Sequence, residues 1–514
     1  MRPYLASAPA AARNPVPGRP RVVVAGGGIA GASAAVVLAE RGIPVVICEA
    51  AGRLGGRLGA HPRTLPDGTV QWVDHGFHGF FRQYYNWRKV LGRISPGPAP
   101  LLHPLGSYPV ISERWPAEEF DRLPPAPPLS IVALALRSPS LRLSALTRAD
   151  HAVGLSLLGF DADQTYAHLD QFSAEQLLSA LRLPERTRAM LFNVFAHSFF
   201  NDAASMSAAE LVAMFHFYFL ANPEGLGMDA PHADYETAIW APLRRYLEQR
   251  GTQILTGTPV TAIDGDGPGH WRVHTETGDT LTAEEVVLAT DAAAAARILG
   301  ASPCATSGDP RLAAVVARPR TGPPYAVARY WLGGDVRHER APFTSIADPG
   351  VLDSVALYHR LEAGARAWHE RTGGSVVELH AYACPPGVDA ASLGAMMLAE
   401  LGRLWPETRR LRRVDQYCHV GTDAAGFPVG GHATTPGVGT ALPGLTLAGD
   451  WVAMPFPCAL MERAAVSGIG AANVILAARG LPAEPVWTVP PRGMLARRWA
   501  AAMRGRPVLP AWSG

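Results

Sequence analysis

Residues 21–50 read RVVVAGGGIAGASAAVVLAERGIPVVICEA, and this stretch predicts the fold of the chain. Residues 22–25 are a short apolar strand, and a glycine-rich turn leads from it into a helix over residues 29–41. Gly42 is expected to end that helix, because glycine readily adopts the left-handed backbone of a helix C-terminus. Residues 45–48 are a second apolar strand. The order strand, helix, strand predicts a β-α-β unit.

The turn of this unit carries the pattern Gly26-x-Gly28-x-x-Gly31. The first glycine permits a tight turn, the second lets the backbone approach a pyrophosphate, and the third packs the helix on the strand. The helix N-terminus supplies free N–H groups and partial positive charge. Glu49, at the end of the second strand, suits the hydroxyls of an adenosine ribose. Both NAD and FAD fit this pattern.

Three further features favour FAD. The segment RLGGR over residues 53–57 follows Glu49, its glycines allow close backbone approach, and Arg57 can neutralise a pyrophosphate. TPV, which ends at Val260, precedes a hairpin around residues 277–279 and the strand that ends in LATD. In LAGD, Asp450 can hold a ribityl hydroxyl, and the helix that begins near Met461 can face the flavin edge where negative charge gathers. The candidates that bind FAD so far are Gly26, Gly28, Gly31, Glu49, Gly55, Gly56, Arg57, Val260, Gly449, Asp450 and Met461.

Composition limits the class of protein. The chain has 514 residues, which is typical of two or three domains, and 48% hydrophobic with 18% charged residues indicates a folded globular protein. A net charge of +2 argues against a nucleic-acid partner. The five scattered cysteines suggest neither zinc spacing nor a disulfide framework, so we expect a reduced, cytoplasmic location. No apolar run reaches the roughly 18–20 residues of a membrane-spanning helix.

The folding unit that starts at residue 21 closes only near residue 480, so the binding domain is expected to be discontinuous. We predict an α/β fold, with a Rossmann-like FAD-binding domain and an inserted α+β substrate domain. The expected parts are a disordered tail over 1–20, FAD-binding parts over 21–100, 236–300 and 421–480, substrate parts over 101–235 (mostly helical) and 301–420, and a basic C-terminal segment over 481–514.

Two helices in the inserted region are marked by capping boxes. Ser173 is followed three residues later by Gln176, and Ser207 by Glu210, each before an apolar run. In the second helix one predicted face is apolar and aromatic. That face is either ordinary core or the lining for a long apolar ligand. Its residues are Leu211, Met214, Phe215, Tyr218 and Phe219.

These motifs, in this order over residues 21–478, resemble the flavin amine oxidase and phytoene desaturase superfamily. The resemblance implies FAD in an extended pose, with an inserted substrate domain over one face of the flavin. It also implies that Asp74-His75-Gly76 lies beside the flavin, which adds Gly76 to the cofactor candidates. The amine oxidases often carry a second arginine two residues after the ribose-binding acid. Ala51 stands there in this chain, so some neutralisation of the pyrophosphate must come from elsewhere.

Longer strings are similar to the carotenoid ring desaturase/methyltransferases of the isorenieratene synthase type. They are GFHGFFRQYYNWR over 76–88, FAHSFFNDAASMSAAELVAMFHFYFL over 195–220, and YETAIWAPLRRYLEQRGTQILTGTPV over 235–260. This resemblance implies aromatisation of a β-ionone ring, as from β-carotene to isorenieratene. Such a ring loses two hydrides, which FAD can accept, and two protons, and one methyl group migrates. The expected substrate-binding residues are Phe77, Phe80, Phe81, Phe215 and Phe219, because aromatic faces stabilise cations without attacking them.

A weak base must take the protons, and a histidine of near-neutral pKa suits that role. His78 is the first catalytic candidate and His75 the second. The alternative for each is a structural role in a glycine-rich loop. We expect no metal ion at this histidine pair, because no third ligand is marked nearby and flavin supplies the redox chemistry.

The expected carotenoid substrate dissolves in a bilayer, so we expect contact with the inner face of the membrane. Residues 129–148 are apolar and basic with no acid. Residues 492–506 carry five arginines around Leu495, Trp499 and Met503. Both segments suit an interface beside anionic lipid. The alternative is a core helix followed by a solvated basic tail.

Two other functions fit the same motifs. One is a flavin desaturase or oxidase that acts on another apolar or amine substrate. The other is a lipid-binding protein that kept the fold without the chemistry, against which the intact cofactor motifs argue. The sequence identifies neither the end group that is preferred nor the acceptor that re-oxidises the flavin.

Overall fold

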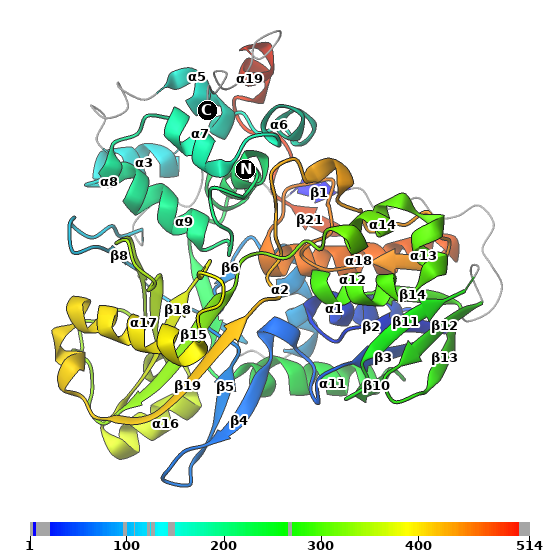
Figure 1. Cartoon of the computed structure of the whole chain (residues 1–514), viewed down its shortest axis with the longest axis horizontal. Helices are drawn as coiled ribbons and strands as arrows, with labels where there is room; N and C mark the ends of the chain where they lie inside the picture. The colour runs from blue at the N-terminus through cyan, green and yellow to red at the C-terminus, as the bar shows by residue number, and fades with distance from the viewer. Residues whose placement is uncertain are drawn as a thin grey trace.

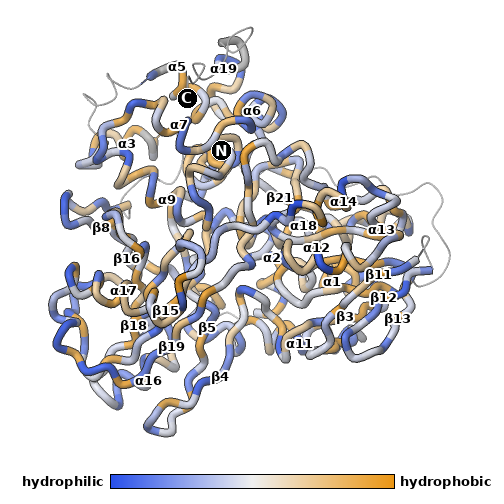
Figure 2. The backbone as a smooth tube through the Cα atoms, viewed as in Figure 1, coloured by the Kyte–Doolittle hydropathy of each residue, from blue (hydrophilic) through white to orange (hydrophobic). Residues whose placement is uncertain are grey.

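The computed structural model describes residues 4–6, 21–95, 100–106, 108–120, 124, 129–141, 150–265 and 270–502. Figure 1 shows three parts: a parallel sheet with its helices at the right, a second sheet at the lower left, and a helical part at the upper left. Hydrophilic residues colour the outer loops near α16 and α17 (Figure 2), whereas the central strands of the parallel sheet are almost entirely hydrophobic.

The parallel sheet has the strand order β10-β3-β2-β14-β20. Its central pair is in register from Val22 opposite Val45 to Ala25 opposite Cys48. The strands come from three separate stretches of the chain, so the predicted discontinuous Rossmann-like domain is confirmed. The strands are β2 (Val22–Ala25), β3 (Val45–Glu49), β10 (Gln253–Thr256), β14 (Glu285–Leu288) and β20 (Leu445–Leu447).

Two apolar helices pack tightly against each other beside this sheet. A Cβ atom at Gly468 of α18 would lie 2.0 Å from the carbonyl oxygen of Ala30 in α1, so only glycine permits this approach. Within the described residues, α18 has the length and hydropathy of a membrane span, but 72% of that window is buried inside the protein. The burial is that of a core helix. The helices of this part are α1 (Ile29–Ala39), α2 (Tyr85–Ile94), α11 (Ala241–Glu248), α12 (Ala292–Gly300), α13 (Pro303–Gly308), α14 (Pro310–Ala317) and α18 (Leu460–Ala478).

The second sheet has the order β19-β15-β18-β17-β16-β8 and is antiparallel except for the pair β16 and β8. Its middle strands β15 and β18 are buried along their whole length, and α17 packs against three of its strands. The elements are β8 (Val110–Ile111), β15 (Tyr325–Leu332), β16 (Phe343–Ile346), β17 (Ser354–Leu357), β18 (Ser375–Ala381), β19 (Arg413–Gly421), α15 (Tyr358–Leu361), α16 (Ala363–Thr372) and α17 (Ala390–Leu404).

Short strands form three further small sheets, β4-β5, β6-β9-β7 and β11-β12-β13. The predicted hairpin near residue 278 is confirmed as β12 paired with β13. Strands β4 and β5 form a second hairpin, and β5 ends at Asp74, directly before the loop that carries His75, Phe77 and His78. The strands are β4 (Ala60–Thr64), β5 (Val70–Asp74), β6 (Phe80–Phe81), β7 (Leu102–Pro104), β9 (Met228–Pro231), β11 (Val260–Asp264), β12 (Trp271–Thr275) and β13 (Thr280–Ala283).

The capping box predicted at Ser173 is confirmed. The Ser173 hydroxyl accepts a hydrogen bond from the backbone N–H of Gln176, and the Gln176 side chain accepts one from the backbone N–H of Ser173. The box predicted at Ser207 is wrong. Ser207 does cap its helix, but the Glu210 carboxylate lies 3.0 Å from the guanidinium of buried Arg463 and serves as its counterion. The helices are α3 (Leu129–Arg137), α5 (His151–Leu158), α6 (Ala162–Leu169), α7 (Ala174–Ala180), α8 (Glu185–Arg188), α9 (Val194–His197) and α10 (Ala208–Phe215), the π-helical turns η2 (Ala189–Asn193), η3 (His216–Leu220) and η4 (Glu236–Trp240), and the 3₁₀ turns η1 (Gly56–Leu58), η5 (Pro406–Arg410) and η6 (His432–Thr434).

Both ends of the chain differ from the sequence-based prediction. Within the predicted disordered tail, β1 (Tyr4–Ala6) pairs with β21 (Val486–Thr488). In the C-terminal segment, Trp499 of α19 (Ala496–Ala502) is fully buried, and a Cβ atom at Gly159 would touch its side chain. Trp499 is therefore a core residue and not an interfacial anchor. Residues 142–148 and 503–506 of the two predicted membrane segments lie outside the described residues.

Candidate functional site

A cavity of about 760 Å³ lies between the parallel sheet, the helical part and the second sheet. All but one of the predicted cofactor residues line it. The exception is Gly31, which packs beneath the turn: a Cβ atom there would lie 1.9 Å from the Gly26 carbonyl oxygen. The lining cofactor candidates are Gly26, Gly28, Glu49, Gly55, Gly56, Arg57, Gly76, Val260, Gly449, Asp450 and Met461.

The glycine turn has room for a ligand above it. A Cβ atom at Gly28 would meet only the Gly55 carbonyl oxygen, at 3.8 Å, and the φ angle of −79° at Gly28 suits any residue. Glycine at this position therefore keeps space free for a bound group and relieves no contact within the protein. An open space beside the N-terminus of α1 fits the pyrophosphate of a dinucleotide.

Glu49 closes the ribose end of this space. Its carboxylate accepts hydrogen bonds from the backbone N–H groups of Gly27, at 2.6 Å, and Ala51, at 2.8 Å. Burial raises the pKa of this carboxyl group, although the N–H groups oppose that rise. Each oxygen keeps lone pairs for further donors, so the arrangement fits ribose hydroxyls.

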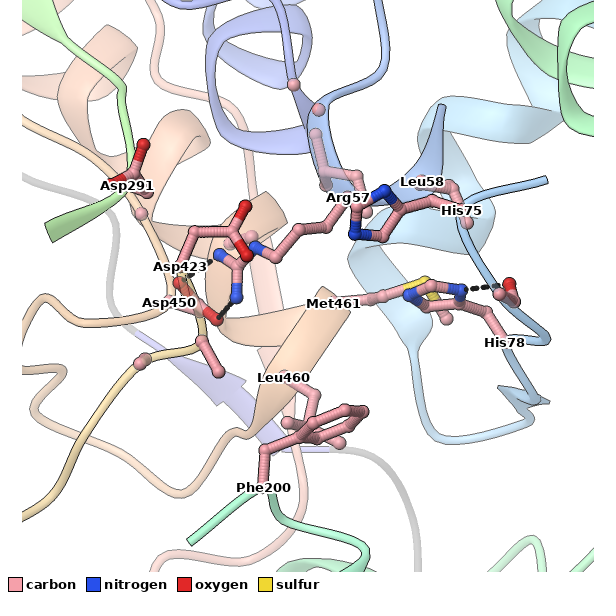
Figure 3. Close-up of a pocket in the computed structure, with 18 of the residues that line it drawn as sticks. Arg57, Leu58, His75, His78, Phe200, Asp291, Asp423, Asp450, Leu460 and Met461 are labelled. Atoms are coloured by element: carbon pink, nitrogen blue, oxygen red, sulfur yellow. Dashed lines mark hydrogen bonds and ion pairs between the residues drawn. The ribbon is translucent and has the colours of Figure 1, made fainter. Parts of the chain in front are cut away.

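Arg57 and Asp450, which were predicted to bind different parts of FAD, bind each other. The guanidinium donates two hydrogen bonds to the carboxylate, at 2.9 and 2.7 Å (Figure 3). Burial lowers the pKa of Arg57, but Asp450 together with Asp423 and Tyr325 raises it, and the net shift is upward, so the group stays charged. The pair uses two of the five N–H donors of the guanidinium, so both residues can still contact a ligand in the cavity.

His78 presents a free ring nitrogen to the cavity. Its Nδ1 lies 2.8 Å from the Gly76 carbonyl oxygen, which only accepts hydrogen bonds, so Nδ1 carries the proton. Nε2 therefore holds a lone pair, and His78 is one of the residues that line the cavity (Figure 3). Burial lowers the pKa of His78 to about 4, so the ring is neutral near pH 7. It is a weak base that is unprotonated and ready to accept a proton.

The ring of His75 carries its proton on the other nitrogen. Its Nε2 lies 2.6 Å from the Tyr325 hydroxyl, which itself lies 2.8 Å from Asp423. The hydroxyl donates its one proton to the carboxylate, so Nε2 of His75 must donate to the hydroxyl oxygen. Burial lowers the pKa of His75 to about 4. The lone pair of the neutral His75 ring therefore lies on Nδ1, whereas that of His78 lies on Nε2.

Aromatic side chains line the part of the cavity beyond His78. Three of the five predicted substrate residues, Phe77, Phe81 and Phe219, are among them, and Phe77 stacks on Phe343 with ring centroids 4.7 Å apart. The string over residues 195–220 contains several lining residues that were not singled out from the sequence. The additional aromatic lining residues are Tyr84, Tyr108, Phe195, Phe199, Phe200, Tyr218, Tyr325, Phe343, Tyr382 and Phe427.

The predictions for Phe80 and Phe215 are wrong. Phe80 is fully buried in the core and contacts Tyr235, because successive side chains of β6 point to opposite faces and Phe81 takes the cavity side. Phe215 stacks on Phe192 in the core. The chain changes to a π-helical turn directly after Phe215, so the predicted 3.6-residue period does not extend through Phe219.

A buried polar network holds the loop from His75 to Gly79. The Phe77 N–H donates to a carboxylate oxygen of Glu378, at 2.8 Å, and the other oxygen lies 2.7 Å from the Arg329 guanidinium. The His78 N–H donates to the hydroxyl of Tyr235, at 2.8 Å. Sequence analysis did not identify these partners, because they lie 157–301 residues away from the loop.

Comparisons with known proteins agree with this geometry. A family model described as flavin containing amine oxidoreductase matches residues 29–476. The chain is 42% identical to a carotenoid phi-ring synthase of Streptomyces griseus over 94% of this chain and 93% of that protein. It is 27% identical to a carotenoid phi-ring synthase of Chlorobaculum tepidum over 93% and 91% of the two chains.

Solved structures show the same fold at lower sequence identity. Cyclohexylamine oxidase from Brevibacterium oxydans matches with a TM-score of 0.62 at 16% identity, over 90% of this chain and 99% of that one. Putrescine oxidase bound to putrescine matches with a TM-score of 0.61 at 17% identity, over 89% and 99%. At these identities the likeness concerns the fold alone.

The open space at Gly28 leads to the first prediction. Gly28→Val should fold, because the added side chain meets nothing closer than about van der Waals distance in the protein, but it should fill the space of the pyrophosphate. We expect the flavin content to fall to less than about a tenth of the parent's, with the melting temperature of the flavin-free protein nearly unchanged. Absorption spectra and thermal melts measure the two quantities.

Gly52→Val is the matched control, because a Cβ atom there meets nothing within 4 Å and the residue does not line the cavity. It should keep its flavin. A full flavin complement in Gly28→Val would show that the cofactor lies elsewhere.

Proposed function

The chain belongs to the flavin-containing amine oxidoreductase family and is an FAD-dependent oxidoreductase, and from that premise we propose that it aromatises the β-ionone end ring of a carotenoid with migration of one methyl group. The observation that carries the proposal is the cavity itself, in which an aromatic wall and the neutral His78 adjoin the cofactor residues. The 42% identity to a carotenoid phi-ring synthase supports this substrate class and a φ-type product ring.

The proposed reaction balances in atoms and electrons. A β-ionone ring has one double bond and a carbon that carries two methyl groups. It becomes a trimethylphenyl ring by loss of two hydrides and two protons, while one methyl group moves to the neighbouring carbon with its electron pair. FAD, when bound, supplies the hydride acceptor, and an external electron acceptor must re-oxidise it between the two rounds.

The wall of the cavity suits a cationic ring. Hydride loss beside a polyene leaves a delocalised allylic cation, and a methyl shift replaces one cation with another. Faces of Phe77, Phe81 and Phe219 can stabilise such charge through their quadrupoles without forming a bond to it. Tyr84 and Tyr218 bind each other through their hydroxyl groups, at 2.6 Å, so these oxygens are already engaged. The wall therefore protects the cation from side reactions.

His78 takes the proton in this proposal. A ring cation is a far stronger acid than an imidazolium, so a base whose pKa is about 4 still removes its proton. The carbonyl of Gly76 fixes the ring and keeps the proton on Nδ1, which leaves Nε2 directed at the substrate. His75, through Tyr325 and Asp423, serves instead to position the wall near the cofactor.

The proposal also places the enzyme at the inner face of the membrane, where a carotenoid resides. The support comes from α3, on which Leu129, Val132 and Leu136 are 65%, 52% and 69% exposed. Their spacing puts them on one helix face, and Arg137 follows at the C-terminal end. An apolar face beside a cation suits insertion into the headgroup region of anionic lipid.

The reaction can be tested in a host that makes β-carotene. Co-expression of the chain should yield carotenoids that are 4 mass units lighter per converted ring, because each ring loses four hydrogens. Mass spectrometry of the pigments, with nuclear magnetic resonance of the new ring, identifies the product and its methyl pattern. Unchanged β-carotene, together with turnover of an amine or another apolar compound by the purified flavoprotein, would contradict the proposal.

The role of His78 leads to a sharper prediction. His78→Ala should bind FAD and carotene nearly as the parent does but form aromatic product roughly 10²–10⁴ times more slowly. In a single turnover the variant should still reduce flavin, since hydride loss precedes deprotonation. In the parent, His78 is neutral above its pKa of about 4, so product formation should be insensitive to this group from pH 8 to about 5 and fall near pH 4.

Phe77→Ala is the comparison variant for this experiment. It should weaken carotene binding and the rate together, without changing flavin content, because it removes part of the wall and no base. Aromatic product at the parental rate from His78→Ala would show that the base lies elsewhere.

Membrane contact through α3 is tested by surface substitution. The triple variant Leu129→Ser, Val132→Ser, Leu136→Ser should keep its flavin and melting temperature, because the three side chains are exposed. Its binding to vesicles with anionic lipid should fall by more than about tenfold, since each side chain contributes up to roughly 1.5–3 kcal/mol when buried in an apolar environment. Sedimentation with liposomes measures the bound fraction.

The control variant carries Val70→Ser, Met396→Ser and Val429→Ser, three exposed apolar residues outside α3. It should bind vesicles as the parent does. Equal loss in both variants, or no loss in either, would remove α3 from the interface. Truncation after residue 485 is not a clean test, because it removes β21 and the buried Trp499.

A further inference from the structure

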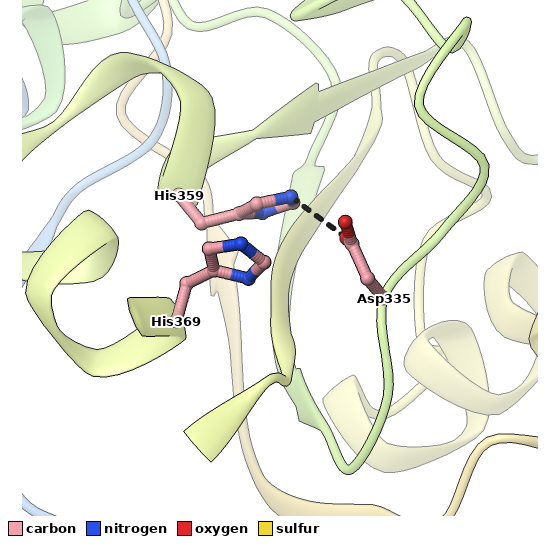
Figure 4. Close-up of side chains that lie close together, drawn as sticks. All are labelled: Asp335, His359 and His369. Carbon is pink, nitrogen blue, oxygen red and sulfur yellow. Dashed lines mark ion pairs between the residues drawn. The ribbon is translucent and has the colours of Figure 1, made fainter. Parts of the chain in front are cut away.

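We propose that Asp335, His359 and His369 form a binding site for one divalent transition-metal cation of the zinc class, separate from the flavin cavity. None of the three residues lines that cavity. One carboxylate oxygen and two imidazole nitrogens of these residues all lie within 4.8 Å of one another. Figure 4 shows the three side chains converging from different segments: the loop after β15, α15 and α16.

The His369 ring is oriented as a metal ligand is, and a backbone carbonyl is also within reach of Nδ1 of His359. Nδ1 of His369 lies 2.6 Å from the Gly374 carbonyl oxygen, so it carries the proton and leaves the lone pair on Nε2. Nδ1 of His359 lies 3.2 Å from both the carbonyl oxygen and the amide nitrogen of Val376. Metal-binding histidines commonly donate their second ring N–H to a backbone carbonyl, which fixes the ring and its tautomer.

The second ring nitrogen of His359 has no hydrogen-bond partner. The residue is only 4% exposed, and Nε2 is buried without a hydrogen bond, although a carboxylate oxygen of Asp335 lies 3.2 Å away. If Nε2 of His359 carried a proton, we would expect it to form a well-aligned hydrogen bond to the Asp335 oxygen. A buried polar atom without a partner calls for an explanation, and a cation between the nitrogen and the oxygen provides one.

The loop that carries Asp335 is fixed to the helix that carries His359. The Arg360 guanidinium donates to the carbonyl oxygens of Val336, Arg337, His338 and Arg340, which follow Asp335 in the chain. Two of the three ligand segments are therefore held together before any metal binds, which reduces the entropy that binding must overcome. The Asp335 side chain is 39% exposed, so a cation has access from solvent.

The ligand set selects the kind of cation. Two imidazole nitrogens with one carboxylate favour zinc, cobalt or nickel over magnesium and calcium, which prefer oxygen ligands. Atoms at 2.0–2.1 Å from a tetrahedral zinc ion lie roughly 3.3 Å apart, so binding must draw the present group, whose atoms lie within 4.8 Å of one another, together by up to about 1.5 Å. The half-buried His369 and the exposed Asp335 are the parts that can move. Water completes the coordination.

The site would fasten α15 and α16 to the second sheet. These helices also bring Tyr358 against the buried Arg329, whose guanidinium lies 3.6 Å from the centre of the tyrosine ring. A bound cation would therefore stabilise the corner of the sheet that supports the loop at His78, without taking part in the reaction. The residues are 24 and 10 positions apart, a spacing that matches no familiar motif, so the sequence did not predict this site.

Metal binding to the full-length flavoprotein tests the proposal. After treatment with a chelator and dialysis, the parent should bind about one equivalent of Zn²⁺ by calorimetry, and Co²⁺ should give the visible absorption of a nitrogen- and oxygen-coordinated ion. Zn²⁺ should raise the melting temperature, because it binds the folded state. Mg²⁺ and Ca²⁺ should neither bind measurably nor raise the melting temperature.

Asp335→Asn and His369→Gln should each weaken Zn²⁺ binding by about tenfold or more. Asp335→Asn is nearly isosteric at an exposed position, so its melting temperature in chelator should match that of the parent. His338→Gln is the matched control: this histidine of the same loop is 99% exposed and outside the site, and its variant should bind as the parent does. The proposal fails if the parent takes up no Zn²⁺, if both ligand variants bind with parental affinity, or if only His338→Gln loses binding.

Discussion

The hydrogen bond from the Phe77 amide to the buried carboxylate of Glu378 is the contact on which the geometry of the site depends. That carboxylate keeps its charge because the Arg329 guanidinium lies 2.7 Å away: burial raises the pKa of Glu378, but Arg329 and then His380 lower it to about 2. Removal of either partner would leave an uncompensated buried charge, at a cost of about 3–5 kcal/mol. The loop beside the cofactor is therefore fixed to the middle strands of the second sheet.

The same contacts explain how an irregular loop can form the wall of an apolar cavity. Backbone N–H groups cost free energy when they are buried without partners. Here the His75 N–H donates to the Gly59 carbonyl, that of Phe77 to Glu378 and that of His78 to Tyr235, and none of these three partners lines the cavity. The loop can therefore present aromatic rings and one imidazole nitrogen to the cavity. A regular strand would present only alternate side chains to the cavity.

The cofactor candidates could be selected from the sequence because their signals are local. Most of them lie at a strand end or a glycine turn, where residue type and neighbours suggest the role, and the parallel sheet then brings these ends together at one cavity. The substrate side depends on orientation. Phe80 and Phe81 are adjacent and chemically identical, yet the pleat of β6 directs one into the core and the other into the cavity. Glu210 fits a capping box by pattern, but the buried Arg463, 253 residues away, takes its carboxylate.

His75 and His78, which lie within four residues of each other, show that the local sequence does not determine the hydrogen-bond partners of a histidine ring. Both lie in one glycine-rich loop, both line the cavity, and burial lowers the pKa of each to about 4. They differ in the partner of one ring nitrogen. A carbonyl oxygen holds the proton of His78 on Nδ1 and leaves Nε2 free, whereas a tyrosine hydroxyl that is committed to Asp423 requires Nε2 of His75 to donate. Each neutral ring keeps one lone pair, on Nε2 in His78 and on Nδ1 in His75. The nitrogen that holds the lone pair of His75 is set by Tyr325, which is 250 residues away in the chain and reaches the loop only through the fold.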